Sequence, residues 1–425
     1  MSLVETKKPF PVSGFVFLIA LLIRGVFVFW MNAQNPKFAW DGDAKDYQSY
    51  AVHLLKDGSY QNDQGDQLFR MPGYPVFLYF IYRVCGVSPL AVQSAQVILG
   101  AFSCLLLFLI MRKLGGEDWG FFCGISLAIL YDAIEPSAQI LSEGLAIPLI
   151  SLFWYLWFCW ENSVNVKSAV LSLVCAALSF VRPEFGLFAL VLCLGYPPVL
   201  SKNSGKQIKG WVWGAVFLAA FTPWMARNWN LFHRLIPSSG QGEAGIYMGL
   251  ALPLEHLGDI SKSKRAPENL GSVEREEFYK REFIRLWHLT PAFKIVKAYA
   301  VNALSVFYPF LPSYDWSYVL FVPLWLWAFF RVRYFPQMFP LWIMLVLYVL
   351  VHTLAGGPVS RYRQVLSPML LILATLGARD LREHFGKNFW KIFSLWGGLN
   401  LSLWAFAPQV RGVVLSIASL LKLHT

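Results

Sequence analysis

The feature that most limits the possible folds of this chain is its series of long apolar segments. A hydrocarbon core about 30 Å thick requires roughly 20 apolar residues per crossing helix. Several segments of the chain meet this requirement, and 56% of all residues are hydrophobic while only 14% are charged. One soluble core cannot bury so much apolar surface. We therefore expect an all-α polytopic membrane protein with about 11 to 13 transmembrane helices.

The predicted spans fall into groups that two long polar segments separate. They cover residues 11–31, 90–111, 118–134, 138–160, 166–181, 184–200, 210–226, 317–331, 337–355, 364–379, 388–407 and 409–422. The first span lacks a small-residue cleavage site and is too long for a signal peptide, so we expect an uncleaved helix. We expect residues 1–425 to form one transmembrane domain without a separate soluble domain. Its long loops are residues 32–89 and residues 227–316, the first and the fourth external loops.

Lysine and arginine are unevenly divided between the two sets of helix ends. One set carries Lys7, Lys8, Arg112, Lys113, Lys167, Lys202, Lys206, Lys209, Arg331, Arg333, Arg379, Arg382, Lys387 and Lys422. The opposite short connections carry only Arg182, Arg361, Arg363 and Arg411. The positive-inside rule then predicts a cytoplasmic N-terminus and places both long loops outside. The net charge of +11 is thus a topology signal, and nucleic acid is not an expected partner.

Other charged side chains gather at the external ends of the predicted helices. These are Asp41, Asp43, Arg70, Asp132, Glu135, Arg182, Arg227, Arg361 and Arg363. Few ionisable residues are expected in the middle of a span. Because transporters place polar groups near the bilayer midplane, this distribution favours chemistry on a lipid-borne substrate at the outer surface. A transporter or flippase for lipid-linked glycans, and a non-catalytic lipid-binding scaffold, stay open as alternatives.

The first external loop begins with the acidic stretch WDGDAKDYQSY, residues 40–50. From Asp43 to about Lys56 the apolar residues follow a helical period, which predicts an amphipathic helix lying along the membrane. Gly58 suits the end of that helix. The bend RMPGYP, residues 70–75, then starts a second apolar segment at 76–84. A turn in which one aspartate caps the helix also accounts for Asp-Gly-Asp.

Beyond these local features, a series of short motifs follows in one order along the chain. They are Asp43 with Tyr47, Ala51 with Leu54, Gly58 with Tyr60, R-x-P-G-Y-P from Arg70, Pro136 with Ser142-Glu143, Arg182-Pro183, T-P-W-x-x-R-N over 222–228, the glycine-bearing segment 236–249, the helix 278–296, and His352 with Ser360-Arg361-Tyr362-Arg363. This order resembles the GT-C glycosyltransferases that use polyprenyl-phosphate sugars. They include protein O-mannosyltransferases, the lipid A aminoarabinose transferase and lipopolysaccharide galacturonosyltransferases.

The resemblance implies a GT-C fold and an inverting transfer from a polyprenyl-phosphate sugar to an acceptor hydroxyl. The acceptor would be lipid A or lipopolysaccharide, another glycan or glycolipid, or a protein. The membrane would be a bacterial inner membrane, with the active site facing outward. Asp43 occupies the position of the family's catalytic aspartate and is the expected base. Many relatives carry a second acid directly after it, where this chain has Ala44, so Asp41 is the expected second carboxylate.

The family also places a basic residue before the proline-rich bend, where it meets the donor phosphate. Arg70 matches this position, and Arg361, Arg227, Arg363 and Arg182 are further candidates because guanidinium groups suit phosphate. Snorkelling to lipid head groups is the alternative for each of them.

Acceptor-binding or orienting roles are assigned to Asp132, Glu135, Glu143, Tyr47, Tyr74 and His352. Glu135 with Pro136 equally suits a helix start, and His352 equally suits a packing role. Glu143 is expected to pair with an arginine.

Little in the chain points to a cofactor. The six cysteines lie mostly inside apolar segments and form no disulfide framework or metal motif. We therefore expect no cofactor, although a divalent metal between Asp41 and Asp43 stays open. In the second long loop, residues 237–245 are expected to form a flap over a substrate. Residues 272–289 are expected to form a charged surface helix.

Overall fold

The computed structural model describes residues 11–40, 42–159, 163–195, 210–267, 270–308, 314–331, 338–359 and 361–406, and every regular element in these ranges is a helix. The helices are α1 (Val12–Gln34), η1 (Phe38–Trp40), α2 (Ala44–Lys56), α3 (Gly73–Cys85), α4 (Pro89–Gly115), α5 (Glu117–Ile129), α6 (Tyr131–Ile134), η2 (Glu135–Ser137), α7 (Glu143–Cys159), α8 (Val164–Val181), α9 (Phe185–Gly195), α11 (Gly210–Phe232), α12 (Gly242–His256), α13 (Ser272–Leu289), α14 (Ala292–Phe307), α15 (Trp316–Phe330), α16 (Phe339–Ala355), α17 (Tyr362–Phe385) and α18 (Asn388–Ala405). The predicted all-α class is confirmed for this part of the chain.

Most of the predicted spans coincide with apolar helices. By length and composition α1, α4 and α17 could each cross a membrane. Helices α7, α8, α15 and α16 are also apolar but shorter. These helices support membrane association, while the number of crossings stays a prediction. The predicted span 409–422 lies outside the described residues.

Two predicted spans have the wrong bounds. Residues 118–134 do not form one helix, because α5 ends at Ile129 and Leu130 has extended backbone before α6 begins. The next helix, α7, begins at Glu143, although the sequence predicted a span from residue 138. The short elements α6 and η2 between them bring Asp132 and Glu135 to the lower end of the bundle. Within the motif-bearing segment 278–296, α13 ends at Leu289 and α14 starts at Ala292, with Pro291 between them.

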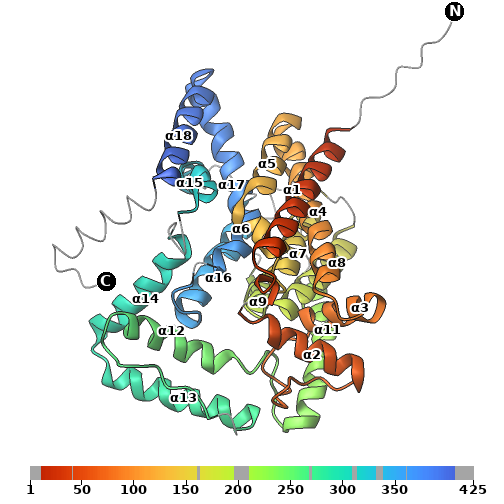
Figure 1. Ribbon diagram of the computed structural model, residues 1–425, viewed down its shortest axis with the longest axis vertical. Helices are drawn as coiled ribbons and strands as arrows, with labels where there is room; N and C mark the ends of the chain where they lie inside the picture. The colour runs from red at the N-terminus through yellow and green to blue at the C-terminus, as the bar shows by residue number, and fades with distance from the viewer. Residues whose placement is uncertain are drawn as a thin grey trace, which may run out of the picture.

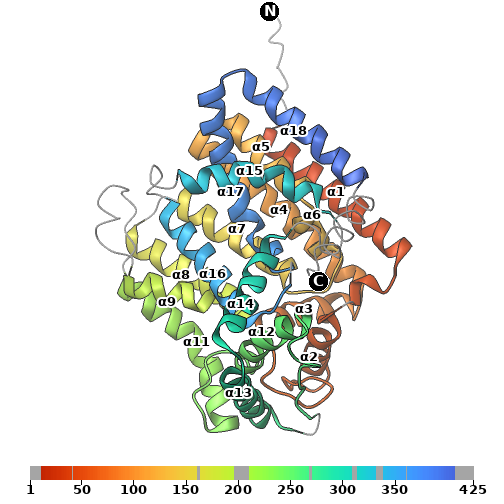
Figure 2. The ribbon, with the colours of Figure 1, turned by 90° about the vertical axis from the view of Figure 1, so that its left-hand side faces the viewer.

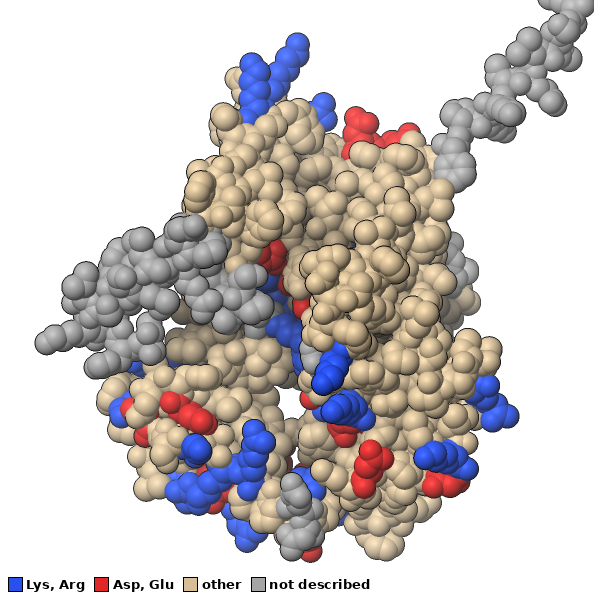
Figure 3. Space-filling view, in the orientation of Figure 1, with Lys and Arg blue, Asp and Glu red and all other residues tan. Residues whose placement is uncertain are grey.

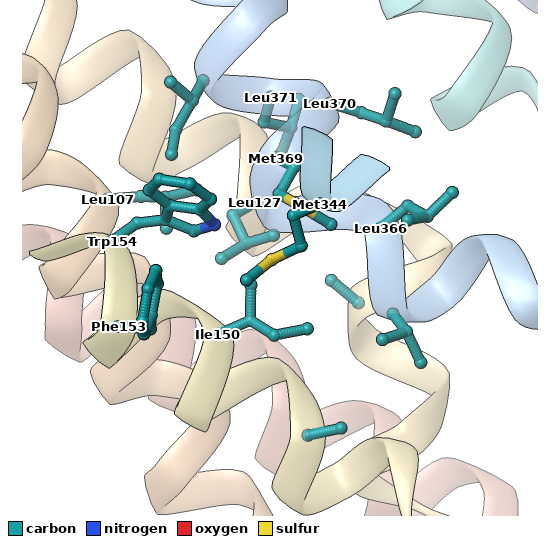
Figure 4. Close-up of a cluster of buried hydrophobic side chains, with 14 of the residues drawn as sticks. Leu107, Leu127, Ile150, Phe153, Trp154, Met344, Leu366, Met369, Leu370 and Leu371 are labelled. Carbon is teal, nitrogen blue, oxygen red and sulfur yellow. The ribbon is translucent and has the colours of Figure 1, made fainter. Parts of the chain in front are cut away.

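Helices α1, α4, α5, α7 and α17 pack around one apolar core (Figures 1 and 2). Figure 4 shows Leu107 of α4, Leu127 of α5, Trp154 of α7 and Met344 of α16 converging on it. Small residues allow α5 to approach α4 closely. A Cβ atom on Gly120 would lie 2.7 Å from the carbonyl oxygen of Phe108. Such close contact at small residues is typical of helices packed in a membrane.

The other helices extend the lower end of this bundle (Figures 1 and 2). Helix α2 lies there on one side, and α12 and α13 lie on the other. The predicted helix from Asp43 to Lys56 is confirmed as α2, which ends at Lys56. Gly58 follows with a φ of +75°. The predicted charged helix over 272–289 is confirmed as α13. The segment 237–245, predicted as a flap, is irregular only to Gln241, because α12 begins at Gly242.

Arg24 lies in the middle of α1 and is fully buried, which the sequence analysis did not anticipate. Its Nη2 donates to the carbonyl oxygens of Leu127 at 3.2 Å and Ala133 at 3.3 Å. The backbone N–H of Tyr131 donates to Ser317 rather than to the carbonyl of Leu127. Arg24 therefore satisfies backbone oxygen atoms where the helix breaks between α5 and α6.

Candidate active site

Asp43 lies at the N-terminus of α2, but its side chain does not cap that helix. No hydrogen bond joins the carboxylate to the backbone of the first helical turn. Instead, Arg70 Nη2 lies 2.9 Å from Oδ1, and Arg361 Nη2 donates to Oδ2 at 2.9 Å. The side chain remains 37% exposed. The fold thus holds this carboxylate between two guanidinium groups and leaves part of it open.

The exposed part of Asp43 faces a cavity of about 720 Å³. Five arginines line this cavity, and only two carboxylate residues do. The arginines are Arg70, Arg182, Arg265, Arg275 and Arg361, and the carboxylate residues are Asp43 and Glu184. We call this space the basic cavity. In Figure 3 a hollow separates the two lower lobes of the molecule, and charged side chains lie along its rim.

Arg70 is held by the loop that joins α2 to α3. It pairs with Asp43 and also with Asp46, whose Oδ2 lies 2.5 Å from its Nε. Its guanidinium carbon lies 4.7 Å from the ring centroid of Tyr47. The fold therefore brings Asp43 and Arg70 of the first loop together, and the ring of Tyr47 contacts the guanidinium group of Arg70.

The charges around Asp43 fix its protonation. Burial of the carboxyl raises its pKa, but Arg70 and Arg361 lower the pKa by more, so the net pKa lies below the ordinary value. Asp43 is therefore ionised at neutral pH and accepts hydrogen bonds with both oxygens.

Behind the basic cavity, Glu143 connects two of its arginines. Its side chain is only 1% exposed, and Oε1 lies 3.1 Å from Arg182 Nη1 and 3.1 Å from Arg361 Nε. Arg182 also pairs with Glu184 at 2.7 Å. His352 lines the cavity, with Nε2 3.5 Å from Glu184 Oε1. The predicted pairing of Glu143 with an arginine is found, and a buried carboxylate shared by two guanidinium groups holds both in place.

A second cavity of about 660 Å³ lies next to the first. Three carboxylate residues and several aromatic side chains line it. The carboxylates are Asp132, Glu135 and Asp315; the aromatic residues are Phe27, Trp30, Tyr131, Tyr314, Trp316 and Trp404; the arginines are Arg361 and Arg363. We call this space the acidic cavity. Arg361 lines both cavities.

Arg363 is already shared between two carboxylates of the acidic cavity. Its Nε lies 2.5 Å from Asp132, its Nη2 donates to Asp315 at 2.9 Å, and its Nη1 donates to the carbonyl of Tyr308. Its guanidinium carbon stacks 3.8 Å from the ring centroid of Tyr318. Arg363 therefore lies outside the basic cavity, with its donors directed at protein groups.

Glu135 is the other notable carboxylate of the acidic cavity. Its Oε2 accepts a hydrogen bond from Gln364 at 2.6 Å, and its Oε1 accepts one from Tyr131 at 3.2 Å. Burial, together with the neighbouring Asp132, raises the pKa of Glu135 to about 7. Among the described residues no cation forms an ion pair with it.

Besides Glu143, two of the candidate residues lie outside both cavities. Arg227 donates to the carbonyl oxygens of Tyr60 at 3.2 Å and Gln67 at 3.0 Å, so it holds the first loop in place. Tyr74 is fully buried and donates to Gln96 at 2.7 Å. Asp41 lies outside the described residues.

With this geometry in view, comparison with known proteins identifies the fold. No protein-family model and no curated protein matches the sequence. The structure is similar to the apo form of the oligosaccharyltransferase of Archaeoglobus fulgidus, with a TM-score of 0.54 and 13% identity over 95% of this chain and 55% of that one. The same enzyme tethered by a disulfide bond to an acceptor peptide containing the NVT sequon gives a TM-score of 0.50 and 13% identity over 93% and 53%.

The chain has the GT-C fold. It spans little more than half the length of the oligosaccharyltransferase that it matches. At this identity the similarity shows the fold alone. Any assignment of substrates and catalytic residues therefore rests on the geometry of the two cavities described above.

Several cavity residues of this GT-C chain were not found from the sequence. Asp46, Arg265, Arg275 and Asp315 were not singled out, and the sequence analysis assigned Glu184 no role. Arg275 belongs to the charged run of α13, which predicted only a solvated surface, yet it pairs with Asp66 at 3.0 Å. The described residues contain no group of three or more His, Cys, Asp or Glu suited to a metal ion. The expectation that no cofactor is needed stays a prediction.

Proposed function

We propose that this chain is an integral-membrane inverting glycosyltransferase. It would transfer a sugar from a polyprenyl-phosphate donor to an acceptor hydroxyl outside the cytoplasm. The observation that carries this proposal is Asp43, a carboxylate exposed to a cavity lined by five arginines and held directly by two of them. A base next to a cationic pocket is what transfer from a phosphate leaving group requires.

The basic cavity supplies the site for the donor phosphate. Arg361 has 31% of its side chain exposed, and Arg182 and Arg265 line the same space. Guanidinium groups hold phosphate oxygens through paired hydrogen bonds, and a partly dry cavity strengthens those bonds. Arg70 completes this wall, although both Asp43 and Asp46 already pair with it.

In the transfer step the acceptor oxygen attacks the anomeric carbon from the face opposite the phosphate. The bond between that carbon and the phosphate oxygen breaks, and Asp43 takes the hydroxyl proton. The arginines hold the charge left on the polyprenyl phosphate. A phosphate bound to Arg361 would also offset the positive charge that lowers the pKa of Asp43, so donor binding would make Asp43 a stronger base.

The apolar helices would hold the donor lipid at the membrane surface. The predicted orientation places the N-terminus in the cytoplasm and both cavities on the outer face of a bacterial inner membrane. Lipid A, lipopolysaccharide or another glycan would be the acceptor. A protein acceptor is a second candidate, favoured by the acceptor peptide tethered to the archaeal oligosaccharyltransferase of the same fold.

The test uses full-length protein in lipid nanodiscs with labelled polyprenyl-phosphate sugars and a bacterial lipid extract. Transfer of label should occur with wild type and be lost with Asp43→Asn. Asp57→Asn is the matched control, because Asp57 lies at the other end of α2 and is exposed. Near wild-type turnover in Asp43→Asn would contradict the assigned base. If no polyprenyl-linked sugar is bound or consumed, the proposed function is wrong.

A further inference from the structure

The two cavities meet at a single point of the chain. Arg361 lines both of them, Asp43 lines the basic cavity and Gly42 lines the acidic cavity. A Cβ atom on Gly42 would lie 3.3 Å from Nη1 of Arg361, so the absence of a side chain keeps this border open. The acidic cavity therefore lies beside Asp43, which is next to Gly42 in the chain and pairs with Arg361.

The acidic cavity is unsuited to a phosphate group. Its lining has three carboxylate residues, and Arg363, the arginine that lines this cavity and not the basic one, is already shared by Asp132 and Asp315. An entering phosphate would meet no unshared cation on the lining of this cavity, and Glu135 would repel it. Like charges placed together in a partly buried space cost free energy, which gives selectivity against the wrong ligand.

The same lining suits a group with hydroxyl or amino donors. Each oxygen of Glu135 accepts one hydrogen bond from the protein and keeps further acceptor capacity. Trp30 of α1 and Trp404 of α18 are 53% and 52% exposed, and their rings line the cavity from two helices. Aromatic faces beside carboxylates match the apolar faces and the polar edges of a sugar ring, and they also attract ammonium groups.

We propose that the acidic cavity is the acceptor site and that it selects a saccharide without phosphate groups, presenting hydroxyl or amino donors. This inference rests on the proposed transferase function. It assigns the phosphate of the donor to one side of Asp43 and a phosphate-free acceptor to the other side. A phosphorylated acceptor, such as a glycan bearing a phosphate on the reacting ring, would be excluded.

The inference is tested by binding of three probes to the full-length protein in neutral-lipid nanodiscs. The probes are hexyl glucoside, hexyl glucosaminide and the 6-phosphate of hexyl glucoside, measured by saturation-transfer NMR. The two phosphate-free probes should bind, and the phosphorylated probe should bind at least about tenfold more weakly. Glu135→Gln should weaken glucosaminide binding about tenfold. Glu277→Gln, at an exposed glutamate of α13 that lines neither cavity, is the matched control.

Trp30→Ala provides a second variant on another element. It should weaken both phosphate-free probes about fivefold through the loss of a ring face. Phosphorylated and neutral probes binding with equal affinity would overturn the inference. So would unchanged glucosaminide binding in both variants.

Binding of a polyprenyl phosphate is measured in parallel and should be the same in wild type, Glu135→Gln and Trp30→Ala. If wild type fails to bind polyprenyl phosphate but keeps the selectivity among glucosides, the saccharide site is supported and the proposed transferase function is wrong. The two failures are therefore distinguishable.

Discussion

The basic and acidic cavities lie side by side at one end of the helix bundle, yet their linings carry opposite excesses of charge. In the basic cavity arginines outnumber carboxylate residues, and Arg265 has no ion pair among the described residues. In the acidic cavity each arginine is shared by two carboxylates, and Glu135 has no cation partner in the described part of the chain. The contrast indicates that a single border, formed by Asp43, Gly42 and Arg361, separates a phosphate environment from a hydroxyl environment.

The largest expected effect is that of removing Arg361, the arginine that lines both cavities. Arg361→Gln leaves Glu143 and Asp43 each short of one positive partner and removes a partly exposed guanidinium group from the proposed phosphate site. We expect turnover to fall about a thousandfold, as is typical when a group that stabilises developing charge is lost. Single-turnover kinetics on the purified protein would measure it.

Arg363→Gln is the comparison for this variant. It removes a more deeply buried guanidinium group, 3% exposed against 31% for Arg361, from the acidic cavity alone, so affinity for polyprenyl phosphate should stay unchanged. If Arg361→Gln and Arg363→Gln weaken phosphate binding equally, the two cavities do not differ as described.

Closing the border should have the next largest effect. Gly42→Leu places a side chain against Arg361 at a position with a φ of +63°, which already disfavours any residue with a Cβ atom. Displacement of the acceptor by about 1 Å costs roughly a hundredfold in rate. We expect that loss in turnover with donor binding retained, as measured by equilibrium binding of labelled polyprenyl phosphate.

Gly65→Leu separates the local strain from the closure. Gly65 has a φ of +74° in the same loop, and no atom lies within 4 Å of a Cβ built there. Equal losses of turnover in the two variants would show that backbone strain, rather than a closed border, causes the effect.

A smaller effect should distinguish the arginines within the basic cavity. Arg265 is exposed, so Arg265→Gln should weaken polyprenyl-phosphate binding only about fivefold. The apparent affinity for the acceptor should not change. Arg281→Gln, at an exposed position of α13 outside the lining, is the matched variant. Weakened acceptor binding in Arg265→Gln would contradict the separation of the two sites.

The smallest expected effect is a pH dependence confined to the acidic cavity. Glu135 has a pKa near 7, so it is mostly protonated at pH 6 and mostly ionised at pH 8. Affinity for hexyltrimethylammonium, whose charge does not titrate, should therefore rise about threefold over this interval. The rise should be absent in Glu135→Gln. A rise that persists in that variant would assign the titration to another group.

Local structure around Asp43 could be predicted from the sequence, whereas contacts between distant segments could not. The apolar period and Gly58 are local signals, and they located α2 and placed Asp43 at its start. The pairing of Asp43 with Arg70 was not predicted, although both residues were singled out in the same loop. The partners of Arg363 depend on α6 and α15, which are distant in the sequence, and no local pattern records them. The role of Arg24 was missed because it depends on the break between α5 and α6, which the apolar sequence of this segment did not indicate.

The distribution of the arginines shows the same limit. Five candidates had similar positions at predicted helix ends, but three-dimensional packing separated them. Arg70, Arg182 and Arg361 line the basic cavity, whereas Arg227 is directed at backbone carbonyl groups. The acidic cavity was not predicted, although the sequence analysis grouped Asp132, Glu135, Arg361 and Arg363 at the same set of helix ends, and all four line this cavity. The sequence indicated which ends of the helices carry charged residues, but it did not indicate which groups each charged side chain contacts.

The central claim is that Asp43 acts on the acceptor while the arginines beside it hold the donor. The most direct test measures donor binding and turnover separately in Asp43→Asn, with Asp57→Asn as the control. The account predicts that the variant binds polyprenyl phosphate at least as tightly as wild type, because a competing carboxylate is neutralised, while transfer falls about a thousandfold. Transfer at near wild-type rate, or equal loss of binding and transfer, would contradict it.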